Sequence, residues 1–150
     1  MNFTKIICVL VLTCFSFSCK EDPASPDNAC TPITSAGQDI ELINPIGGET
    51  VKQGSTVKVQ WKVNKNKISS VVIQLSTDNK KNWKDVVQRI AVNGNDGEFV
   101  CMEENWNVGS EYETIGYSTT GETKVFLRVG KYGEANSVNA TTPSTISVVP

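Results

Sequence analysis

The residues of this sequence best suited to contacting a ligand lie in one long segment, Glu103–Glu122. It carries Trp106, Tyr112 and Tyr117 among polar residues. Aromatic side chains combine a large apolar area with a polar edge, which suits stacking on a sugar ring or anchoring a protein contact. A segment of this length between two strands is usually functional or hides a missed element. Two alternatives follow: the three aromatic residues form a ligand-binding loop, or Trp106 is a core residue and Thr114–Ser118 is a short strand.

Acidic residues are the other candidates for chemistry, because two suitably spaced carboxylates can hydrolyse a glycosidic bond. Glu111 and Glu113 would share one face of a strand, whereas Glu103 and Glu104 would point to opposite faces. Nothing in the sequence indicates a hydrophobic pocket around them, so we interpret them as solvated surface acids. The chain has no histidine, which excludes a Ser-His-Asp or Cys-His mechanism and a His-liganded zinc or iron site. We therefore expect that the protein is not an enzyme.

Oxygen-bearing side chains are dense in Asn93–Glu98, so a calcium site is one interpretation of this segment. Its spacing does not match that of an EF-hand loop. A tight hairpin turn is the interpretation that we favour. We expect no metal site and no cofactor.

The first residues have the form of an export signal. Met1–Lys5 carries one positive charge, and the apolar run Ile6–Phe17 is shorter than the roughly 20 residues of a transmembrane helix. A small residue then precedes Cys19, and Lys20–Asp22 ends the apolar character. This start resembles that of bacterial outer-membrane lipoproteins. The resemblance implies a signal peptide over residues 1–18, palmitate and related lipid on Cys19, and a position on the outer face of the outer membrane. Ordinary secretion with an unmodified Cys19 is the alternative.

Removal of residues 1–18 would leave Cys30 and Cys101 as unmodified cysteines in an oxidising compartment. A disulfide between them is one interpretation, and two unpaired thiols with a buried Cys101 is the other. The same removal takes away one lysine and no acidic residue, so the net charge falls from −2 to −3. The chain has no block of basic residues that could neutralise phosphates, so we expect no nucleic-acid partner.

The mature chain divides into a tether and one domain. Residues 19–38 are rich in Pro, Ser, Asp and Ala and show no hydrophobic period, as in a flexible tether. Residues 39–150 consist of short β-branched runs between turn signals, and Thr56–Val63 alternates strictly between polar and apolar residues. The predicted strands are Ile40–Asn44, Thr56–Val63, Ser69–Ser76, Val86–Val92, Glu98–Met102, Lys124–Val129 and Thr145–Val149. This pattern predicts an all-β domain, an immunoglobulin-like antiparallel β-sandwich of about seven strands.

Two groups of motifs follow one another in this domain. They are Pro45-Ile46-Gly47-Gly48-Glu49 with Gly54-Ser55 and Val59-Gln60-Trp61, and then Val71–Leu75 with Ser76–Trp83. Together they resemble an immunoglobulin-like domain of secreted bacterial proteins and of the Ser/Thr-rich GPI-anchored surface protein family of fungi. The resemblance covers residues 40–149 and implies a sandwich at a cell surface or wall, with no fixed activity.

The segment Ser76–Trp83 also resembles an Asp-box hairpin. We expect Asp78 to accept hydrogen bonds from backbone N–H groups of the turn, and Asn79 to adopt the left-handed conformation. Trp83 is expected to pack beneath the hairpin and, like Trp61, to be a core residue. A propeller needs several repeated blades, so this single copy indicates a structural hairpin and no sialidase.

These expectations describe a surface lipoprotein that presents a non-catalytic binding module and reaches the membrane through Cys19. Its partner would be a polysaccharide or another envelope protein. A structural accessory subunit of an outer-membrane complex is the alternative, and a small secreted hydrolase is a distant one.

Overall fold

The computed structural model describes residues 38–94, 97–110 and 115–150. Within these ranges the regular secondary structure is entirely β. The strands are β1 (Ile40–Asn44), β2 (Thr50–Lys52), β3 (Thr56–Asn64), β4 (Ser70–Ser76), β5 (Lys84–Ala91), β6 (Phe99–Asn107), β7 (Thr123–Lys131), β8 (Asn139–Thr141) and β9 (Ile146–Val149). No helix in the described ranges is long and apolar enough to cross a membrane.

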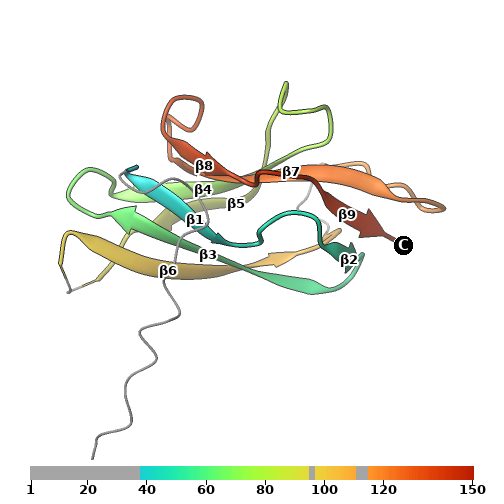
Figure 1. Cartoon of the computed structure of the whole chain (residues 1–150), viewed down its shortest axis with the longest axis horizontal. Helices are drawn as coiled ribbons and strands as arrows, with labels where there is room; N and C mark the ends of the chain where they lie inside the picture. The colour runs from blue at the N-terminus through green and yellow to red at the C-terminus, as the bar shows by residue number, and fades with distance from the viewer. Residues whose placement is uncertain (1–37, 95–96, 111–114) are drawn as a thin grey trace, which may run out of the picture.

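The strands form two sheets, which lie as two layers in Figure 1. One sheet has three strands in the order β1-β3-β6, and its pairs are antiparallel. The other has six strands, in the order β2-β9-β7-β4-β5, with β8 pairing with β7 beside β9. The pair β2 and β9 is parallel, and the other pairs of this sheet are antiparallel. The prediction of an all-β fold is therefore confirmed.

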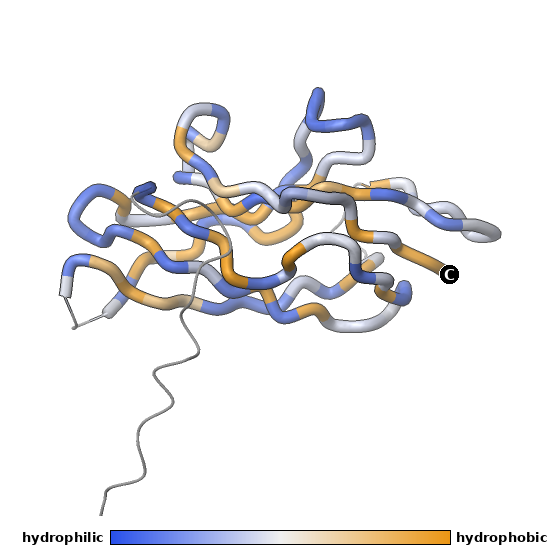
Figure 2. The backbone as a smooth tube through the Cα atoms, in the orientation of Figure 1, coloured by the Kyte–Doolittle hydropathy of each residue, from blue (hydrophilic) through white to orange (hydrophobic). Residues whose placement is uncertain are grey.

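The core lies between the two sheets and follows from the period of two in the strands. In β3 the apolar positions Val59, Trp61 and Val63 are fully buried, while the alternating polar positions from Thr56 to Lys62 are half-buried or exposed. The inward positions of β4 are Val71, Ile73 and Leu75, and those of β7 are Val125, Leu127 and Val129. Burying each such side chain stabilises the fold by about 1.5–3 kcal/mol. Figure 2 shows hydrophobic residues recurring along the strands, whereas the connection between β4 and β5 is hydrophilic.

The predicted strands are all present, with small differences at their ends. The largest difference is β6, which continues to Asn107 because it pairs without interruption along β3. Two strands were not predicted, β2 and β8. Each has three residues, too few to show an alternation, and each exists through its pairing with β9 or β7.

The three tryptophans have different environments. Trp61 is fully buried, as predicted, and so is Trp106. Trp106 is buried because the extended β6 places it on the same inward face as Val100. Trp83 is only half-buried, so the prediction that it is a core residue is wrong. It precedes β5 and stacks on a side chain of the outer face of the six-stranded sheet, away from the space between the sheets.

Candidate ligand-binding site

A polar hollow of about 570 Å³ opens on the outer face of the six-stranded sheet. Its floor is formed by outward-facing residues of β4, β5 and β7, and one wall is the connection between β7 and β8. Figure 1 shows this connection and the β4–β5 connection rising from the same face of the sheet. The lining residues are Val72, Gln74, Asp85, Arg128, Tyr132, Gly133, Glu134, Ala135, Asn136 and Ser137.

Arg128 is the central residue of the hollow. Because Leu127 and Val129 point into the core, the strand alternation directs Arg128 to the outer face. Its Nε donates a hydrogen bond to Oε1 of Gln74 at 2.7 Å, and its Nη2 donates one to Oδ1 of Asn136 at 2.9 Å. The ring of Trp83 covers the guanidinium group, 4.1 Å from its central carbon. As a result, Arg128 is only 5% exposed although it lies on an outer face.

The charge of Arg128 is not neutralised by a direct ion pair in the described part of the chain. The ion pairs found there are Lys58–Glu103, Lys67–Asp39 and Lys131–Glu134. Asp85 is nearby, but its Oδ1 accepts a hydrogen bond from Nε2 of Gln74 at 2.6 Å, so the amide lies between the two charges. Burial lowers the pKa of Arg128, and the charge of Asp85 opposes this shift in part. Burial without an ion pair is unusual for arginine.

The wall formed by residues 132–138 is fixed by close packing and by hydrogen bonds. Gly130 allows the approach, because a Cβ at this position would lie 2.5 Å from Cβ of Ala135. The carbonyl group of Ala135 accepts a hydrogen bond from Nδ2 of Asn139 at 2.8 Å. At the start of the connection, Lys131 forms an ion pair with Glu134 at 2.8 Å. The position of Asn136 beside the guanidinium is therefore set before any ligand arrives.

Tyr132 stands at the rim of the hollow with 47% of its surface exposed. The guanidinium group of Arg89, from β5, lies 5.7 Å from the centre of the tyrosine ring. On the other side of Arg128, Nζ of Lys80 lies 4.3 Å from the ring of Phe126. With the stack of Trp83 on Arg128 included, three cation–aromatic pairs connect the region around β7 with β5 and with the β4–β5 connection.

The β4–β5 connection is organised by Asp78, as the Asp-box resemblance implied. Its Oδ1 accepts hydrogen bonds from the backbone N–H of Asn82 at 2.9 Å and from the hydroxyl of Ser76 at 2.8 Å. Hydrogen bonds lower the pKa of Asp78 to about 2, and those donated by Asn82 have the largest effect. Asn79 has a φ of 59°, which confirms the predicted left-handed conformation, and Lys80 shares it with a φ of 68°. This turn delivers Trp83 to the face of Arg128.

The aromatic residues predicted to bind ligand do not form an exposed surface in the described part. Trp106 is fully buried, so it is a core residue and is withdrawn as a ligand contact. Tyr117 is half-buried and packs against the core, contrary to the exposed position expected for it. Tyr112 lies outside the described residues, as does Thr114. Residues 115–118 form no strand.

Cys101 lies on the outer face of the three-stranded sheet, where it is exposed and disulfide-bonded. The alternative of a buried free thiol is therefore wrong. The other cysteines of the chain, Cys19 and Cys30 among them, all lie in residues 1–37, outside the described ranges. The pairing of Cys101 with Cys30 stays a prediction.

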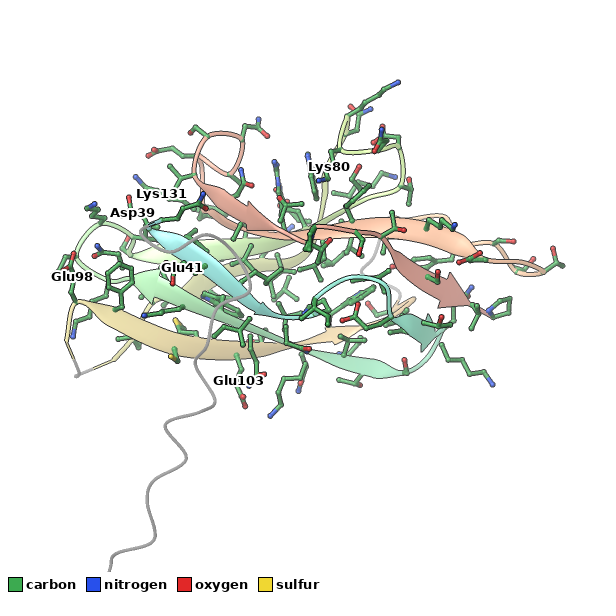
Figure 3. All side chains as sticks on the ribbon, in the orientation of Figure 1. Asp39, Glu41, Lys80, Glu98, Glu103 and Lys131 are labelled. Carbon is green, nitrogen blue, oxygen red and sulfur yellow. The ribbon has the colours of Figure 1, made fainter. Side chains whose placement is uncertain are left out.

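Of the acidic residues considered for chemistry, two lie in the described part of the chain and two lie outside it. Glu103 is exposed on β6 and forms an ion pair with Lys58 at 3.1 Å, and the hydrogen bond from Lys58 lowers the pKa of Glu103. Figure 3 shows Glu103 on the side of the molecule opposite Lys80. Glu111 and Glu113 lie outside the described residues, as do residues 95 and 96 of the predicted hairpin turn. In the part that the structure describes, no three His, Cys, Asp or Glu side chains are grouped so that they could hold a metal ion.

The hollow leaves no continuous pattern in the sequence, because its residues come from separate elements. Gln74 and Arg128 occupy outward positions of two predicted strands, and the register that pairs Gln74 with Arg128 brings them together. A single polar residue in an outward position looks like ordinary solvated surface. The available signal was the segment after the predicted strand Lys124–Val129, which contains Tyr132 and Asn136.

No protein-family model, no curated protein and no solved structure matches the chain.

Proposed function

We propose that this chain is a surface lipoprotein whose domain is a non-catalytic binding module, and that its ligand occupies the hollow around Arg128. The observation that carries the proposal is the hollow itself, with a nearly buried guanidinium group on its floor and a half-exposed tyrosine on its rim. Ligand sites are concave surfaces in which a few polar groups are fixed in place beside aromatic area. Here Gln74, Asn136 and Trp83 fix Arg128 through the contacts described above.

A glycan is the ligand class that we favour. Toward sugar hydroxyls an amide can donate and accept, a carboxylate accepts, and a guanidinium group donates. All three kinds meet on this surface, in Gln74, Asp85, Asn136 and Arg128. The exposed ring of Tyr132 suits the apolar face of a pyranose. An envelope protein is the alternative partner.

The finer classification of the fold belongs to the same proposal. We infer an immunoglobulin-like sandwich, and the strand order supports it: a three-stranded sheet β1-β3-β6 faces a sheet β2-β9-β7-β4-β5. The motifs Pro45–Glu49 and Ser76–Trp83, which resemble those of an immunoglobulin-like surface domain, lie in the turns that connect these strands.

The proposed anchor agrees with the position of the hollow. Cys101 lies on the outer face of the three-stranded sheet, whereas the hollow lies on the outer face of the other sheet. A disulfide from Cys101 to Cys30 would hold the tether against the face opposite the hollow. A chain lipidated at Cys19 would then turn the hollow away from its own membrane.

A glycan array probed with the mature lipidated protein in detergent tests the binding function. We expect a subset of glycans to bind, and Tyr132→Ala to weaken their binding without unfolding the domain, because this side chain is half exposed. Lys58→Ala, on the opposite sheet, is the control and should bind like the native protein. An array without binders, together with one abundant membrane protein recovered in a pull-down, would favour the accessory subunit instead.

The anchor is tested separately. Cys19→Ala should abolish metabolic labelling with palmitate, since the lipid would be attached to that thiol. Labelling that persists in the variant would contradict the lipoprotein proposal. Replacing Lys20–Asp22 by alanines should leave the protein lipidated but protected from external protease, and unchanged protease access would remove the claim of surface display.

A further inference from the structure

We propose that the hollow selects a glycan unit with one carboxylate, as in a uronic acid, and that Arg128 binds this carboxylate. The inference rests on the proposed function, because it names the ligand class of the same hollow. It starts from one feature, a guanidinium group that is nearly buried and has no carboxylate at ion-pair distance in the described part of the chain.

The surroundings of Arg128 compensate its charge only in part. The two oxygens that accept its hydrogen bonds belong to the neutral amides of Gln74 and Asn136, and the remaining close contact is the ring of Trp83. Removing a charge from water without a counter-ion is costly, and its burial lowers the pKa of Arg128 accordingly. A ligand that brings a negative charge into the hollow would remove this cost, which is why such groups mark functional sites.

The guanidinium group still has donors to offer. Of its five N–H groups, one on Nε and one on Nη2 are used by Gln74 and Asn136. Both N–H groups of Nη1 make no hydrogen bond to a described residue. A carboxylate accepts two parallel hydrogen bonds from such a planar group, which is the strongest geometry available to this pair.

The other charges of the hollow favour a single negative charge over two. Asp85 and Glu134 both line it, and Glu134 already neutralises Lys131 at 2.8 Å. Among the charged groups that line the hollow, Asp85 and Arg128 have no ion pair in the described part of the chain, so a phosphate dianion would bring two negative charges beside Asp85 with one guanidinium group on the floor to meet them. A uronic acid carries one charge, and its hydroxyl groups can donate to Asp85 and to the carbonyl oxygen of Asn136.

The size and rim of the hollow suit a sugar as the carrier of this charge. Its volume of about 570 Å³ lies within the range of about 300–1,000 Å³ that is typical of ligand pockets. The ring of Tyr132 is exposed beside it, and Arg89 lies over that ring at 5.7 Å. A pyranose ring can stack on the tyrosine while its carboxylate reaches Arg128.

The test measures equilibrium binding of the mature lipidated protein, in detergent, to short oligomers of galacturonic, glucuronic and mannuronic acid. Each oligomer is compared with its methyl ester, which removes the charge and keeps the sugar. We expect at least one acid to bind about tenfold or more tightly than its ester. Arg128→Met should abolish the preference, whereas Lys58→Met, which removes the same charge from the opposite sheet, should keep it.

Each other outcome is decisive as well. Equal binding of acid and ester, or tighter binding of a phosphorylated sugar than of any uronic acid, would overturn this inference and leave a glycan-binding module. Absence of binding to every glycan on the array would remove the proposed function together with the inference. If Arg128→Met does not fold, Arg128→Lys takes its place, because it keeps the charge but loses the planar pair of donors. It should lower the ratio of acid to ester binding, and an unchanged ratio would overturn the inference.

Discussion

The close approach of Gly130 and Ala135 sets the wall of the proposed site, and it can be tested by adding one methyl group. In Gly130→Ala the new Cβ would lie 2.5 Å from Cβ of Ala135 and 2.9 Å from its Cα, where ordinary contact begins at 3.4 Å. The backbone of Gly130 is not in the left-handed region, so alanine fits the strand itself. The connection must therefore move outward by about an ångström, and overpacking of this kind costs about 1–3 kcal/mol.

Urea-induced unfolding measures this cost, and Gly116→Ala is the matched control. A Cβ at Gly116 meets no atom of the described residues within 4 Å, so this variant should change the free energy of unfolding by less than about 0.5 kcal/mol. Adding Ala135→Gly to Gly130→Ala removes the closer contact, at 2.5 Å, but leaves the contact to Cα at 2.9 Å, so it should recover part of the loss. The reasoning is refuted if Gly130→Ala is as stable as Gly116→Ala, or if the two changes at 130 and 135 are simply additive.

Three further predictions concern other parts of the fold. Trp61→Ala should lower the free energy of unfolding by about 3–5 kcal/mol in a urea melt. Trp83→Ala should lower it by about 1–2 kcal/mol, because Trp83 is half-buried on an outer face. Equal losses would contradict the different environments of the two side chains. Intact-mass measurement should show Cys30 and Cys101 linked by a disulfide, which for a loop of about 70 residues contributes on the order of 4 kcal/mol, and two thiols that react without reductant would contradict it. Hydrogen bonds in the folded state lower the pKa of Asp78 from 3.8 to about 2, so the ionised carboxylate stabilises the ordered turn above pH 3.8. This stabilisation is lost as the pH falls through about 2. An NMR titration of the carboxylate with a midpoint near 3.8 would show that the turn does not hold it.

The strands and the centre of the core could be predicted from the sequence because a period of two is a local property. In β3 the alternation around Trp61 assigned each side chain to the correct face. The alternation did not decide between the two alternatives for Trp106, since the polar residues of β6 beyond Met102 conceal it, and only pairing with β3 extends that strand. The structure confirms the alternative that Trp106 is a core residue. Burial of Trp106 is thus a consequence of tertiary contacts.

The candidate site could not be predicted, because it depends on register and on a loop. The pairing of β7 with β4 places Arg128 beside Gln74. Arg128 contacts Asn136 because the β7–β8 connection packs closely against Gly130. Neither contact leaves a local pattern in the sequence. The turn around Asp78 was predictable for the opposite reason: its hydrogen bonds join residues at most four positions apart.

The central claim is that ligand binds at Arg128, and NMR of the isotope-labelled mature protein tests it most directly. On titration with the glycan that binds best on the array, the side-chain signals of Arg128 and Asn136 should shift, and so should the indole N–H of Trp83, which contacts the guanidinium. The indole signals of Trp61 and Trp106, buried between the sheets, should stay in place. Shifts that spare Arg128 and gather on the outer face of β1, β3 and β6 would contradict the claim.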